Sequence, residues 1–167
     1  RLDLGGVAKG YAVDRGWEIL RSSGIKGALI NGGESSIRVL GTRPGGAPWR
    51  IAISHPREEK WVGVLELPPG KAIGTSADTQ RFFESGGRRY SHLLNPFSGY
   101  PPTDLLAATL VADTALEADL FSTAVFVAEG EDRSKLVLRL HAEGVMVNPD
   151  GKVTETPGLR DQLREAP

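Results

Sequence analysis

The hydrophobic positions of this chain form short runs, which glycine- and proline-rich turns separate. In the first run, apolar residues recur at helical spacing after Gly6, and this spacing predicts a helix that ends at Ser22-Ser23-Gly24, where glycine supplies a left-handed cap. Shorter runs, either uniformly apolar or alternating with polar residues, predict β-strands over residues 27–30, 36–40, 49–53, 61–67, 72–76 and 105–111.

The second half of the chain adds two helices and two hairpins. A helix is expected over residues 114–127, with Asp113 or Thr114 as its N-cap, and a second helix over residues 133–142. Hairpin turns are expected at Ser85-Gly86-Gly87 and at Asn148-Pro149-Asp150-Gly151.

These elements predict an α+β fold in which residues 1–167 form a single domain, with a mainly antiparallel sheet meander and helices packed on one face. The net charge of -1 gives no electrostatic ground for binding nucleic acid or an anionic membrane surface. No apolar run is long enough to span a bilayer. The absence of cysteine excludes disulfides, thiolate metal sites and a cysteine nucleophile.

The first stretch with candidate chemistry is the glycine turn before the first helix. Gly5 and Gly6 allow the backbone to approach a ligand closely. The free N–H groups at a helix start attract anions, and Lys9 adds a positive charge there. The alternative is an ordinary turn into an amphipathic helix with Lys9 in solvent. The stretch has neither the pattern of a P-loop nor that of a dinucleotide-binding fold.

A second candidate lies on the helix expected over residues 114–127. Asp119 and Thr123 are four residues apart, so they share one face of that helix, and the rest of the face is small and mostly apolar. A carboxylate on a core-facing stripe needs a partner. A hard cation such as Mg²⁺ fits, because it takes carboxylate, hydroxyl and carbonyl oxygens. The alternative is a solvated helix face with Asp119 exposed.

His92 is a candidate general base, because an imidazole titrates near neutral pH. It precedes residues 95–102, where three prolines and a glycine predict a shaped loop. The alternative is a histidine without a chemical role. Thr75 and Ser76 offer hydroxyls at a strand end that suit phosphate or ribose, and the turn Asn31-Gly32-Gly33-Glu34 either cradles a ligand or is only a hairpin turn.

Taken together, these stretches resemble the ApbE family of FAD:protein FMN transferases (flavin transferases). The resemblance runs nearly the whole length of the chain in one order. The matching stretches are Asp3-Leu4-Gly5-Gly6-Val7-Ala8-Lys9-Gly10-Tyr11-Ala12-Val13-Asp14, Asn31-Gly32-Gly33-Glu34, Pro48-Trp49-Arg50-Ile51, Thr75-Ser76, Arg81-Phe82-Phe83, Arg89-Tyr90-Ser91-His92-Leu93-Leu94-Asn95-Pro96 and Ala118-Asp119-Leu120-Phe121-Ser122-Thr123-Ala124.

The resemblance implies an Mg²⁺-dependent enzyme that uses FAD as its substrate. Such an enzyme transfers FMN through a phosphoester bond to a threonine or serine hydroxyl of an acceptor protein, and some members hydrolyse FAD to FMN and AMP. It also implies a part of the fold before Arg1, so this chain would be the C-terminal portion of a periplasmic protein or membrane-anchored lipoprotein.

The resemblance also assigns roles to residues. Asp119 and Thr123 would bind Mg²⁺ together with a backbone carbonyl of the Gly5-Gly6 turn. His92 would activate the acceptor hydroxyl, and Lys9 would lie at the diphosphate of FAD. A list of residues expected near the flavin nucleotide completes the assignment: Gly5, Gly6, Lys9, Glu34, Thr75 and Ser76. Family members more often have Asp where this chain has Asn95.

Two other functions are compatible with the same residues. One is a non-catalytic fragment that binds flavin nucleotides, for which weak Mg²⁺-dependent binding of FAD and no transfer is expected. The other is a structural module that self-associates through uncovered sheet edges.

Overall fold

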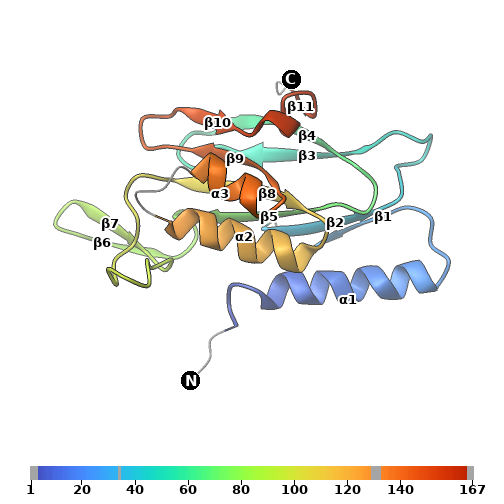
Figure 1. Cartoon of the computed structure of the whole chain (residues 1–167), viewed down its shortest axis with the longest axis horizontal. Coiled ribbons are helices and arrows are strands. Elements are labelled where there is room, and N and C mark those ends of the chain that lie inside the picture. The colour runs from blue at the N-terminus through green and yellow to red at the C-terminus, as the bar shows by residue number, and fades with distance from the viewer. Residues whose placement is uncertain (1–3, 34, 129–132, 165–167) are drawn as a thin grey trace.

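The computed structural model describes residues 4–33, 35–128 and 133–164. Two antiparallel sheets are stacked, and three helices cover the outer face of the larger sheet (Figure 1). The larger sheet has six strands, in the order β1 (Ala28–Asn31), β2 (Ser36–Leu40), β5 (Ala72–Ala77), β8 (Ala107–Ala112), β9 (Glu143–Val147) and β10 (Val153–Glu155).

The other strands form two smaller sheets. β3 (Trp49–Ser54) and β4 (Trp61–Leu67) form a hairpin, and β11 (Leu163–Arg164) adds to the free edge of β4 after the short 3-10 helix η1 (Pro157–Leu159). A separate hairpin of β6 (Phe82–Ser85) and β7 (Arg88–Ser91) extends away from the stacked sheets (Figure 1).

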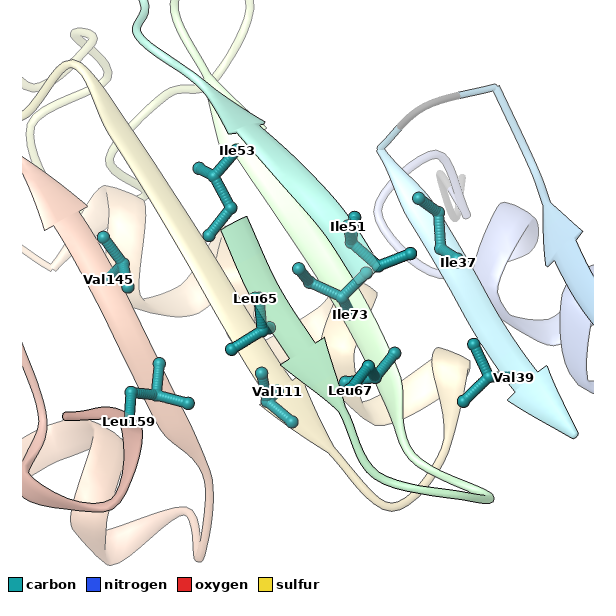
Figure 2. Packing of buried hydrophobic residues seen from close by; sticks show 10 residues of the cluster. All are labelled: Ile37, Val39, Ile51, Ile53, Leu65, Leu67, Ile73, Val111, Val145 and Leu159. Carbon is teal, nitrogen blue, oxygen red and sulfur yellow. The ribbon is translucent and has the colours of Figure 1, made fainter. Parts of the chain in front are cut away.

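The main hydrophobic core lies between the two stacked sheets. Alternate residues of each strand point to opposite faces, so Ile73, Val111 and Val145 face the smaller sheet while their neighbours face the helices. Figure 2 shows these side chains meeting those of β3 and β4, among them Leu65 and Leu67, which are fully buried.

The helices cover the opposite face of the larger sheet. α2 (Ala115–Val127) lies directly on β5 and β8, and α1 (Ala8–Ser22) packs against α2. Two glycines permit this close approach, because a Cβ at Gly74 would lie 2.2 Å from the Ala118 carbonyl oxygen and one at Gly10 would lie 2.3 Å from the Ala115 carbonyl oxygen. α2 is therefore held between β5 and α1 by contacts of main chain with main chain.

The structure confirms the expected α+β class, the mainly antiparallel pairing and the helices on one face. Two details differ from expectation. β3 and β4 leave the central sheet and form a second layer, because their alternating apolar residues cover its inner face. The second helix, α3 (Arg133–Arg139), is shorter than predicted, since the chain turns at His141, whose φ is +52°. Within the described ranges, no helix has the length and apolar character to cross a membrane.

Candidate metal and nucleotide site

Asp119 is the buried acidic residue at the centre of the candidate site. Only 4% of this residue is exposed, and its Oδ2 atom accepts a hydrogen bond of 3.0 Å from the backbone N–H of Gly10, in the first turn of α1. Burial raises the pKa of Asp119, and the Gly10 N–H and the positive charge of Lys9 offset part of that rise. In the part of the chain that the structure describes, no cationic side chain forms an ion pair with Asp119. The sequence alternative of an exposed Asp119 is therefore wrong.

Three hydroxyl groups lie next to Asp119. The Ser76 Oγ atom, on β5, is 3.0 Å from Ser122 Oγ and 3.1 Å from Thr123 Oγ1, both on α2. Ser122 and Thr123 also donate to the backbone carbonyl of Asp119, at 3.0 and 3.1 Å. β5 and α2 approach each other closely at Gly74, where there is no side chain. This close approach brings the hydroxyls of Ser76 and Thr123 together.

The glycine turn before α1 reaches the same place. A Cβ built at Gly6 would lie 3.7 Å from Thr123 Oγ1, so the Gly6 turn lies next to that hydroxyl. The Leu4 carbonyl accepts the backbone N–H groups of Val7 and Ala8 at 3.1 and 2.9 Å, which fixes the turn. The structure therefore brings the glycine turn and the first turn of α1 next to Thr123 and Asp119 of α2, more than a hundred residues further along the chain.

This donor set fits a hard divalent cation such as Mg²⁺. It offers a carboxylate, a hydroxyl and main-chain carbonyls, which are the oxygen ligands that such a cation takes, and the buried carboxylate lacks a cationic partner among the described side chains. No cluster of three or more histidine, cysteine, aspartate or glutamate side chains occurs in the described residues. Among the described residues, a cation bound here would use the Asp119 carboxylate and fill other positions with neutral oxygens, water or phosphate.

Lys9 lies on the exposed side of this group. Its Nζ atom donates to the Ser35 hydroxyl, and the Ser35 carbonyl accepts the backbone N–H of Thr75 at 2.8 Å. Lys9 thus connects α1 to the turn between β1 and β2. Glu34, which the sequence placed near the nucleotide, lies outside the described residues.

Thr75 lies on the other face of the sheet from Ser76. Its hydroxyl is 3.0 Å from the hydroxyl of Thr109 on the neighbouring strand, and strand alternation directs both toward the smaller sheet. The structure therefore does not bring Thr75 into the group around Asp119, although Ser76 belongs to it.

His92 follows the last residue of β7, at a strand end as the sequence predicted, and it is exposed. Its backbone N–H donates to the Arg81 carbonyl at 2.9 Å, and its Nδ1 atom lies 3.2 Å from that same oxygen. Arg81 is five residues after Ser76, so the main chain at His92 lies within roughly 20 Å of the hydroxyl group cluster.

Sequence reasoning missed the role of Asp14. This buried carboxylate accepts the N–H groups of Ala115 and Leu116 at 2.8 and 2.9 Å and pairs with Arg38 at 2.7 Å. Together with the capping box of Thr114, it fixes the start of α2 and thereby the position of Asp119 along the sheet. Asp14 belongs to the first stretch that the sequence analysis singled out. Its role could not be read there, because the helix start that it binds lies about a hundred residues away in sequence.

Several known proteins are similar to this chain in sequence. The profile of the ApbE family matches residues 1–146. A protein of Rhodobacter capsulatus named FAD:protein FMN transferase is 35% identical over 164 residues, which is 98% of this chain and 31% of the relative. A protein of the same name from Vibrio cholerae is 37% identical over 139 residues, which is 81% of this chain and 41% of the relative.

Two solved structures share the fold. The ApbE protein of Thermotoga maritima superposes with a TM-score of 0.90 and 34% identity, over 99% of this chain and 54% of that one. The flavinyl transferase ApbE of Pseudomonas stutzeri, in its apo form, superposes with a TM-score of 0.80 and 35% identity, over 100% and 53% of the two chains. The chain thus spans about half or less of these relatives.

Proposed function

Because this chain belongs to the ApbE family, we propose that the protein to which it contributes transfers FMN from FAD to a serine or threonine hydroxyl of an acceptor protein, with Mg²⁺ bound at Asp119 and Thr123. The observation that carries the proposal is a buried carboxylate that accepts the Gly10 N–H, with a hydroxyl one helical turn later that lies next to the glycine turn before α1. The names of the relatives, which are FAD:protein FMN transferases, supply the reaction class.

The transfer replaces the phosphoanhydride link of the FAD diphosphate with a phosphoester link to the acceptor. The acceptor oxygen attacks the phosphorus of the FMN moiety, a P–O bond forms, the bond to the bridging oxygen of the diphosphate breaks, and AMP leaves with that oxygen. A bound Mg²⁺ supplies neutralisation of the charge that develops on the phosphate oxygens. The acceptor hydroxyl loses its proton, and we assign the uptake of that proton to His92, which is exposed and can reach a macromolecular substrate.

The remaining residues position the phosphates and the metal ligands. Lys9 would place its ammonium beside the diphosphate, close to the positive end of the α1 dipole. Ser76 would hold the Thr123 hydroxyl, since the two oxygens are 3.1 Å apart. Hydrolysis of FAD, in which water replaces the acceptor hydroxyl, stays a prediction. Export of the protein from the cytoplasm is a prediction as well.

The test compares two histidine variants of the whole protein. His92→Ala should reduce FMN transfer to an acceptor by at least roughly a hundredfold, because general base catalysis contributes on that order. His141→Ala, which removes another exposed histidine at the end of α3, should leave transfer unchanged. Transfer is read as covalently bound flavin fluorescence on the acceptor, and circular dichroism checks folding. Full activity of His92→Ala would remove this residue from the proposed reaction.

A further inference from the structure

The hairpin of β6 and β7 presents an exposed face that its own fold does not cover. Between Phe82 and Tyr90 no described residue is buried, and Phe83 is 63% exposed. The hairpin also stands apart from the stacked sheets (Figure 1). Large apolar side chains exposed in this way commonly mark an interaction site.

The two faces of the hairpin differ in their chemistry. Strand alternation and the pairing of Phe83 with Tyr90 place Phe83, Arg88 and Tyr90 on one face, which we call the outer face. Phe82, Glu84 and Arg89 lie on the other face, where Arg89 pairs with Glu84 at 3.2 Å and covers the ring of Phe82 at 3.8 Å.

On the second face the charged groups of Glu84 and Arg89 pair with each other, whereas the charged group of the outer face has no such partner among the described residues. The rings of Phe83 and Tyr90 are stacked at 5.0 Å with an angle of 8° between their planes, and the Arg88 guanidinium lies 5.2 Å from the centre of the Tyr90 ring. Among the described residues Arg88 forms no ion pair. The outer face therefore combines a preformed aromatic platform with a cation that can pair with a partner.

The outer face leads directly to the candidate base. The His92 N–H bonds to the Arg81 carbonyl and continues the hairpin ladder by one pair, so alternation places His92 in one row with Tyr90 and Arg88. In extended chain, Arg88 and His92 are about 13 Å apart. A segment that presents a hydroxyl to His92 must therefore pass over or beside this row.

The charge of the region selects the kind of segment. The hairpin and its next pair, residues 81–92, contain Arg81, Arg88 and Arg89 against Glu84 alone, which gives +3 and -1, a net charge of +2. The whole chain has a net charge of -1, so the positive charge is local to the hairpin. An acidic segment would pair with Arg88 and lay an apolar or backbone surface over the Phe83–Tyr90 platform.

We propose that the outer face of the β6–β7 hairpin docks an extended acidic segment of the acceptor protein, with an aspartate or glutamate about four residues from the hydroxyl that receives FMN. The proposal rests on the proposed transfer function, because it is the acceptor hydroxyl at His92 that sets the register. It adds to that function a recognition surface and a rule for the acceptor sequence.

The first test measures binding to this chain without any turnover. The probe is a fluorescein-labelled peptide of about ten residues, long enough to cover some 33 Å when extended, with a central threonine and an aspartate four positions to either side. Fluorescence anisotropy should show binding that weakens when asparagine replaces both aspartates, and that weakens as ionic strength rises. Arg88→Gln should weaken binding roughly three- to fivefold.

Matched variants separate docking from general effects. Arg89→Gln removes a neighbouring arginine that is already paired, and it should leave the affinity nearly unchanged. Phe83→Ser should weaken binding about tenfold, whereas Ile19→Ser, which removes another side chain that is 61% exposed, should not. Equal losses from Arg88→Gln and Arg89→Gln, or equal binding of the aspartate and asparagine peptides, would overturn the proposal.

Two further outcomes identify a different occupant. A single-stranded oligonucleotide that displaces the peptide from the same residues, at equal or higher affinity, would overturn the proposal in favour of a general polyanion surface. In the whole protein, a Phe83→Ser variant that lowers the melting temperature yet leaves the acceptor KM unchanged would show that the rest of that protein covers the hairpin.

The whole protein also separates this proposal from the proposed function. A raised acceptor KM in Arg88→Gln, with unchanged turnover at saturating acceptor, supports docking. An unchanged KM in a protein that transfers FMN overturns docking and leaves the transfer function standing. Binding of the peptide in a protein that transfers no FMN would overturn the transfer function alone.

Discussion

Replacing Asp119 with asparagine separates a structural role from a metal-binding role. The amide oxygen of asparagine can still accept the Gly10 N–H, which Asp119 accepts at 3.0 Å. The negative charge, however, is lost. Burial raises the pKa of Asp119, so the folded chain binds this proton more tightly than the unfolded chain does. The stability from this group is present at low pH and is lost as the pH rises through the folded-state pKa.

At neutral pH without a divalent cation, Asp119→Asn should therefore be at least as stable as the native chain. With Mg²⁺ at a hundred times its dissociation constant, the native chain should gain about 2.7 kcal/mol. For a chain of this length each kcal/mol raises the melting temperature by about 2–4 °C, so the expected gain is roughly 5–11 °C. The asparagine variant should gain none of it, because a neutral amide cannot replace the charge of the Asp119 carboxylate as a ligand of Mg²⁺.

The assay is thermal unfolding by circular dichroism, in Mg²⁺ and then in EDTA. Asp161→Asn is the control, since Asp161 is an exposed aspartate in a turn. It should keep the full Mg²⁺-dependent gain. If Asp119→Asn and the native chain gain equally from Mg²⁺, or if the native chain gains nothing, the assignment of Asp119 as a metal ligand is refuted.

Three further predictions concern packing, capping and pH. Gly10→Ala should lower the melting temperature strongly, at a cost of about 1–3 kcal/mol, because its Cβ would lie 2.3 Å from a main-chain oxygen. Gly16→Ala, in the same helix, should be neutral or stabilising in the same melts, because its Cβ would lie 3.8 Å from the Ile30 side chain. Thr114→Ala should cost about 1 kcal/mol in urea unfolding, since it removes the capping box of α2; an unchanged midpoint would show that Asp14 caps the helix alone. Hydrogen bonding to Arg133 holds the pKa of Asp104 below its usual value, so its contribution is present at neutral pH and is lost as the pH falls through the folded-state pKa. Arg133→Gln should therefore reduce the loss of stability between neutral and acid pH, and a loss equal to that of the native chain would contradict the assignment.

Local elements could be predicted from the sequence because their signals are local. The end of α1 at Gly24, whose φ is +80°, and the Thr114 cap of α2 depend on residues within one turn. The β6–β7 hairpin likewise follows from Gly86 and Gly87, which both have positive φ. These features need no knowledge of the rest of the chain.

Features set by distant residues could not be predicted in the same way. Asp119 and Thr123 were recognised as a pair on one helix face, but the Gly10 N–H that meets Asp119 is 109 residues away. Thr75 and Ser76 were grouped as neighbours, and only the packing of α2 on β5 shows that the Ser76 face, not the Thr75 face, meets Ser122 and Thr123. Sequence spacing gives the face of an element, whereas the partner of that face depends on the topology.

The close contact of α2 with β5 and α1 restricts the movement of the residues that α2 carries. Asp119 and Thr123 are carried by a helix that touches its neighbours main chain to main chain, so small side-chain adjustments cannot change their spacing. His92, by contrast, sits at the base of a two-stranded ribbon in which residues 81–90 bury nothing completely, and such ribbons open at low energetic cost. The proposed metal site is thus stiff, and the proposed proton acceptor His92 is more mobile. We expect the two to reach their working separation only when an acceptor chain steadies the ribbon, which would restrain idle consumption of FAD by water.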